Sequence, residues 1–162
     1  MKVYIKNRQR RIKVNQKRII SHLRKALSLL GLHNAEVSIL LVNDRRMKEL
    51  NLRYRGLDNT TDVLSFPQID NPPLPPFIKG GRGGIMNSEC LTADIVLGDI
   101  VINLHKAKRQ AVERDLTFNE ELSWLLIHGL LHLIGYDHEK RRCFRNKMES
   151  KERELLSALY RS

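Results

Sequence analysis

Residues 117–138 have the sequence TFNEELSWLLIHGLLHLIGYDH, and the rest of the fold is predicted to pack around them. Thr117 and Glu120 have the T-x-x-E spacing of a capping box, which predicts the start of a helix. Apolar residues then follow almost without interruption to Ile134, so this helix is predicted to be the buried central helix of the protein. Gly135 is predicted to end it, because glycine readily adopts the positive φ that is common just after a helix.

Three histidines fall in the second half of this stretch: His128, His132 and His138. The first two are four residues apart, so both rings leave the same face of the helix. Beyond Gly135 the chain is predicted to turn and bring the third histidine back toward them. Three neutral imidazoles around one point form a metal site with an open coordination position. We expect one zinc ion per chain, although imidazole also suits nickel and copper.

The spacing HxxxHxxxxxH is the metzincin-like spacing of a protease family. In those enzymes a glutamate follows the first histidine and acts as general base, whereas this chain has Gly129. Peptide hydrolysis by that mechanism is therefore disfavoured. Asp137 either orients a histidine, assists proton transfer or is simply a turn residue. A closed structural site would need a fourth protein ligand, for which Cys90 and Cys143 are the candidates.

Weaker patterns on both sides of this helix predict the other elements. Strands are predicted at 3–5, 37–42 and 63–66, with one or two segments at 93–102 around Gly98; helices are predicted before Gly31, after Asn43-Asp44, at 104–114 and at about 140–160. Because these elements do not alternate strictly, we expect an α+β fold over residues 1–162: a single domain with a mixed sheet of about four strands and about five helices. Residues 68–92 hold four prolines and four glycines, which predicts a long surface loop insertion.

The positive charge is concentrated at the start of the chain. The formal net charge is +11, and residues 1–25 contain ten lysines and arginines but no acidic residue. This favours a polyanion partner, nucleic acid before membrane, with a solubilising surface as the alternative. No run of eighteen apolar residues exists, which excludes a membrane-spanning helix. The two separated cysteines and the absence of an apolar leader predict a cytoplasmic protein.

Three sequence blocks together resemble one known family. Residues 128–138 match H-G-x-L-H-L-x-G-Y-D-H, residues 50–67 contain LNLRYRG and TDVLSFP, and residues 97–102 are LGDIVI. In their order and spacing these blocks are similar to those of the YbeY family, the metal-dependent endoribonucleases that act in ribosomal RNA maturation. The similarity covers nearly the whole chain, and the insertion at 68–92 is the departure from the family pattern.

The resemblance implies a zinc ion bound by His128, His132 and His138, and a functional role for Arg55. We therefore expect a single-strand-directed endoribonuclease acting in 16S-type ribosomal RNA 3′ end maturation and ribosome quality control. Its partners would be RNA and the ribosome or small ribosomal subunit, with no membrane; the sequence does not indicate an oligomeric state. The alternatives are a metal-dependent peptidase and a non-catalytic ribosome-associated zinc protein.

The predicted catalytic residues are Arg55, His128 and Asp137. A metal with three neutral ligands keeps its full charge, lowers the pKa of bound water to about 7 and stabilises charge on phosphate oxygens. Arg55 would hold a non-bridging phosphate oxygen. The basic segment 1–25 and three further cations (Lys106, Lys108 and Arg109) would follow the RNA backbone. Either the metal-bound water or the RNA 2′-hydroxyl could be the nucleophile.

Overall fold

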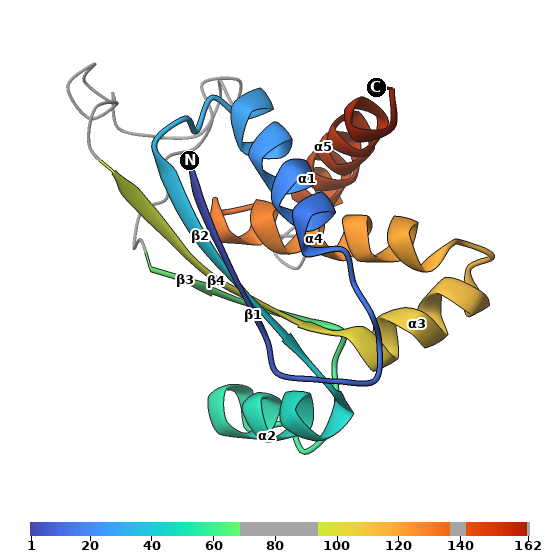
Figure 1. Ribbon diagram of the computed structural model, residues 1–162. Helices are drawn as coiled ribbons and strands as arrows, with labels where there is room; N and C mark the ends of the chain where they lie inside the picture. Colours follow the sequence, from blue (N-terminus) through green and yellow to red (C-terminus); the bar gives the residue numbers. More distant parts are fainter. Residues whose placement is uncertain (69–93, 137–141, 162) are drawn as a thin grey trace.

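The computed structural model describes residues 1–68, 94–136 and 142–161. These residues form one four-stranded sheet and five helices (Figure 1). In chain order they are β1 (Lys2–Asn7), α1 (Gln16–Leu29), β2 (Ala35–Val42), α2 (Asp44–Arg55), β3 (Val63–Pro67), β4 (Ile95–Asn103), α3 (Leu104–Glu113), α4 (Phe118–Leu133) and α5 (Arg142–Tyr160). The predicted α+β class is confirmed. Apart from Gln68, the predicted loop insertion at 68–92 lies outside the described residues.

The sheet is mixed and has the strand order β1-β2-β4-β3. β1 pairs with β2 and β2 with β4 in parallel, while β3 runs antiparallel to β4. The carboxyl ends of the three parallel strands therefore lie at the same end of the sheet. β4 is one strand and not two: it continues through Gly98, whose φ of 135° lies beside a shift in the β2–β4 register.

The two faces of the sheet are covered differently. α1, α4 and α5 pack on one face, and α2 packs on the other (Figure 1). Residues Ile39 and Ile100 point into the larger core beneath α1, α4 and α5, whereas Val42 and Val101 form a smaller core with Met47 of α2. Each fully buried aliphatic side chain stabilises the fold by roughly 1.5–3 kcal/mol. The larger core therefore fixes α4 against the sheet.

The predicted limits of α4 are confirmed. Thr117 Oγ1 accepts a hydrogen bond from the Glu120 backbone N–H at 3.3 Å, and the Glu120 carboxylate accepts one from the Thr117 N–H at 2.8 Å. Gly135 follows the helix with a φ of 93°. Most α4 side chains are buried, as its apolar sequence predicted. No helix in the described part of the chain is long and apolar enough to cross a membrane.

Candidate metal centre

Two of the predicted ligands meet on α4. His128 Nε2 and His132 Nε2 lie 3.1 Å apart, and their ring centroids are 4.6 Å apart. Two nitrogens that bind one zinc ion at about 2.05 Å with a tetrahedral angle would be about 3.3 Å apart. The spacing of the two histidines therefore fits a shared metal ion, as the i, i+4 pattern predicted.

The first of these histidines is oriented by a residue of α5. The carboxylate of Glu152 lies 2.7 Å from His128 Nδ1, and Glu152 is only 7% exposed. A carboxylate can only accept a hydrogen bond, so Nδ1 carries a proton, and in the neutral imidazole Nε2 then keeps its lone pair. This carboxylate–histidine arrangement is the one that supports metal-bound histidines in proteins.

Glu152 was not among the site residues predicted from the sequence. A signal was present, because Met148, Leu155 and Leu159 form the buried side of α5 and Glu152 has the spacing of the same side. A carboxylate among buried apolar positions requires a buried polar partner. His128 is that partner, but only the packing of α5 on α4 reveals it.

Aromatic and cationic side chains complete the setting of His128. The Trp124 ring stacks on the His128 ring with centroids 4.8 Å apart and an interplanar angle of 25°. The Arg114 guanidinium lies 4.9 Å from the Trp124 centroid and binds Glu121 at 2.9 Å. Burial raises the pKa of Glu121, and Arg114 only partly offsets this rise. This stacking restricts rotation of the His128 ring, because Trp124 contacts the face of the ring while Glu152 binds its Nδ1.

Gly129 lies where α4 packs closely against the sheet. A Cβ at this position would stand 2.7 Å from Ile100 Cγ2 of β4, and the Gly129 carbonyl accepts a hydrogen bond of 3.1 Å from Ser65 Oγ of β3. Any side chain here would collide with the sheet. The position at which metzincins carry their glutamate is therefore closed by packing. Ser65, which lies within the strand predicted at 63–66, therefore helps to hold α4 against the sheet.

The structure does not describe four of the other predicted or candidate ligand and catalytic side chains. Asp137, His138 and Cys90 lie outside the described residues, as does the side chain of Cys143. The described residues alone therefore supply no complete group of three metal ligands. These predictions stay predictions.

Arg55 is exposed at the last residue of α2, which lies on the sheet face opposite α4. Its neighbour Tyr54 contacts Phe66 of the edge strand β3 at 5.0 Å between ring centroids. The structure thus places Arg55 near the β3 edge, and within the described residues it makes no contact with His128 or His132.

Comparison with known proteins shows which family this chain belongs to. A family model described as Endoribonuclease YbeY matches residues 4–160. The chain belongs to the YbeY family. The YbeY relative from Thermodesulfovibrio yellowstonii is 36% identical over 97% of this chain and 96% of its own length. The YbeY relative from Aquifex aeolicus is 37% identical over 98% of this chain and 91% of its own length.

A solution structure of a protein from Thermotoga maritima has a similar fold. It superposes with a TM-score of 0.64 and 26% identity, over 98% of this chain and 89% of that protein. These comparisons confirm the predicted resemblance and, with it, the predicted class of metal-dependent endoribonuclease.

Proposed function

We propose that this protein is a zinc-dependent endoribonuclease that cleaves single-stranded regions of ribosomal RNA. It acts in 16S-type 3′ end maturation and ribosome quality control, on the ribosome or its small subunit in the cytoplasm. The observation that carries this proposal is the pair of Nε2 atoms 3.1 Å apart on α4, with Glu152 behind His128, in a chain of the YbeY family. Residues 1–162 form a single catalytic domain.

The donor set of the chain fits one zinc ion. His128 and His132 present imidazole nitrogens on one helical face, and His138 is the third ligand in this proposal. A bound divalent ion supplies a lowered water pKa of about 7 and stabilisation of charge on phosphate oxygens. Glu152 holds the proton at His128 Nδ1, and Trp124 restricts the imidazole ring.

The remaining predicted residues act on the RNA. Arg55 holds a non-bridging phosphate oxygen through a forked pair of N–H donors. Asp137 moves a proton or orients His138. In this proposal the histidines bind the metal ion, so replacing one of them changes the metal content. Arg55 binds only the RNA, so replacing it leaves the metal content unchanged.

Cleavage of single-stranded RNA by four variants tests the proposal. His128→Ala should lose both bound zinc and cleavage, whereas Arg55→Ala should lose cleavage and keep its zinc. The controls are His33→Ala and Arg161→Ala, which remove an exposed histidine and an exposed arginine from other parts of the molecule. Folded His128→Ala protein that cleaves RNA as fast as the wild type would refute the site.

A peptide digest with excess zinc tests the peptidase alternative. We expect no cleavage, because the glutamate that this mechanism requires is replaced by the closely packed Gly129.

A further inference from the structure

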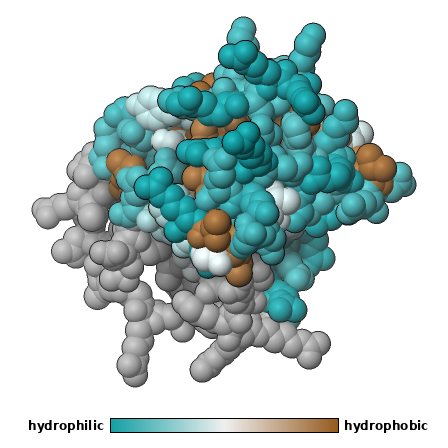
Figure 2. Space-filling view, turned by 90° about the horizontal axis from the view of Figure 1, so that it is seen from below, coloured by the Kyte–Doolittle hydropathy of each residue, from teal (hydrophilic) through white to brown (hydrophobic). Residues whose placement is uncertain are grey.

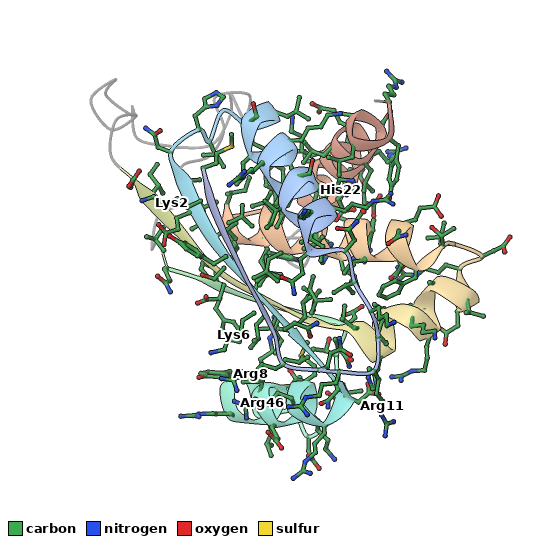
Figure 3. The ribbon with its side chains drawn as sticks, viewed as in Figure 1. Lys2, Lys6, Arg8, Arg11, His22 and Arg46 are labelled. Atoms are coloured by element: carbon green, nitrogen blue, oxygen red, sulfur yellow. The ribbon has the colours of Figure 1, made fainter. Side chains whose placement is uncertain are left out.

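Three arginines stand together in the loop that follows β1. Arg8, Arg10 and Arg11 are exposed, and Figure 3 shows the labelled Arg8 and Arg11 at the end of the molecule occupied by α2. Within the described ranges, no carboxylate forms an ion pair with any of the three. Because all three arginines line one pocket, their positive charges repel one another, and an anion bound in that pocket would offset this repulsion.

A buried glutamine fixes the shape of this loop. Gln9 is only 6% exposed, although it lies between exposed arginines. Its Nε2 donates to Asn7 Oδ1 at 3.1 Å and to the Ile12 carbonyl at 2.8 Å, and its Oε1 accepts from the Ile12 N–H at 2.9 Å. The Arg8 N–H also donates to the Leu41 carbonyl of β2 at 2.8 Å. The arginines are therefore presented by an ordered loop and not by a mobile tail.

The loop forms one wall of a pocket, which we call the arginine pocket. It has a volume of about 470 Å³ and is lined by Arg8, Gln9, Arg10, Arg11, Asn43, Asp44, Arg45 and His105. These residues follow the carboxyl ends of β1, β2 and β4, where ligands commonly bind in sheets with parallel strands. A second hollow, lined also by Lys108, continues from it and shares Arg11 and His105.

The one carboxylate of the arginine pocket is already neutralised. Arg109 donates two hydrogen bonds to Asp44, at 2.8 and 2.9 Å, and lowers the pKa of that carboxyl to about 2. His105, which also lines the pocket, lies with its Nδ1 3.8 Å from the same carboxylate of Asp44. The pocket therefore keeps an excess of positive charge.

The arginine pocket is separate from the metal centre. None of its lining residues belongs to α4 or α5, which carry the histidine pair and Glu152. The face that contains α2 is largely hydrophilic (Figure 2), as a surface that contacts a polyanion requires.

We propose that the arginine pocket binds backbone phosphates of the RNA strand at a point away from the bond that is cleaved. Guanidinium groups suit this role, because their forked N–H donors match phosphate oxygens. The inference rests on the proposed RNA substrate. The whole basic segment 1–25 was predicted to contact RNA, and this proposal assigns that contact to the loop after β1, whose shape Gln9 fixes.

Equilibrium binding of an uncleavable 2′-O-methyl RNA to the zinc-loaded protein tests the arginine pocket. The double variant Arg10→Gln/Arg11→Gln should weaken binding about tenfold or more at about 0.15 M salt, and should reduce the salt slope by about 1.4, because two phosphate contacts are lost. The matched control Lys17→Gln/Arg24→Gln removes the same charge from exposed positions of α1 outside the pocket, and should weaken binding less than about threefold. Equal losses in the two variants would overturn the proposal in favour of general electrostatic attraction.

Two further measurements decide how the pocket works. Gln9→Ala leaves the net charge unchanged but frees the loop, so RNA affinity should fall severalfold; unchanged affinity would show that the pocket is not preformed. Inorganic pyrophosphate distinguishes a free anion from RNA. Tight pyrophosphate binding that Arg10→Gln/Arg11→Gln abolishes without changing RNA affinity would also overturn the proposal. Because the RNA is uncleavable, these outcomes stay readable even if the protein proves to have no ribonuclease activity.

Discussion

Replacing Glu152 by glutamine removes the charge behind His128 while preserving the size of the side chain. In the wild type the carboxylate accepts a hydrogen bond of 2.7 Å from Nδ1 at a position that is 7% exposed. Hydrogen bonds to charged groups contribute roughly 1.5–3 kcal/mol. Since 1.4 kcal/mol corresponds to a factor of ten, zinc affinity should fall about 10- to 100-fold.

Competition with a chromophoric zinc chelator at neutral pH measures this change directly. Glu149→Gln is the matched control, because Glu149 is an exposed glutamate of the same helix. The control should keep the wild-type zinc affinity, and both variants should retain their helix content. If Glu152→Gln binds zinc as tightly as the wild type, Glu152 does not support the metal ligand, and the carboxylate–histidine arrangement has no role in metal binding.

Two predictions concern stability. Gly129→Ala should lower the free energy of unfolding by about 1–3 kcal/mol in a denaturant titration, because the new Cβ would stand 2.7 Å from Ile100 Cγ2; an unchanged midpoint would contradict the close packing of α4. Arg109 lowers the pKa of Asp44 from 3.8 to about 2. The ion pair therefore contributes its full stabilisation of the folded state above about pH 4, and this stabilisation is lost as the pH falls toward 2. Asp44→Asn should remove about 1 kcal/mol of this acid-sensitive stability, since the pair is partly exposed, whereas Asp58→Asn, an exposed control, should not.

Local signals made the helices and the histidine pair predictable. Each helix signal lies within a few residues of the helix end that it determines. These signals are the capping box at Thr117, the glycine after each of α1 and α4, and the Asn43 cap of α2. The 3.6-residue period placed His128 and His132 on one face for the same reason.

Contacts between distant segments could not be predicted in this way. The strand order β1-β2-β4-β3 depends on pairing between strands more than fifty residues apart. Glu152 lies 24 residues from His128, and only the docking of α5 on α4 makes them partners. The placement of Arg55 on the opposite sheet face likewise follows from the core around Met47, which no local pattern specifies.

The hydrogen bond between His128 and Glu152 joins the proposed zinc site to α5, the helix that carries Glu152. α5 buries Met148, Leu155 and Leu159 against the core and contributes Glu152 to the imidazole. Coupling between two binding events is reciprocal, so a zinc ion that gains affinity from docked α5 must hold α5 in place by the same free energy. Undocking of α5 would therefore release zinc, and zinc removal would make α5 more accessible to proteases.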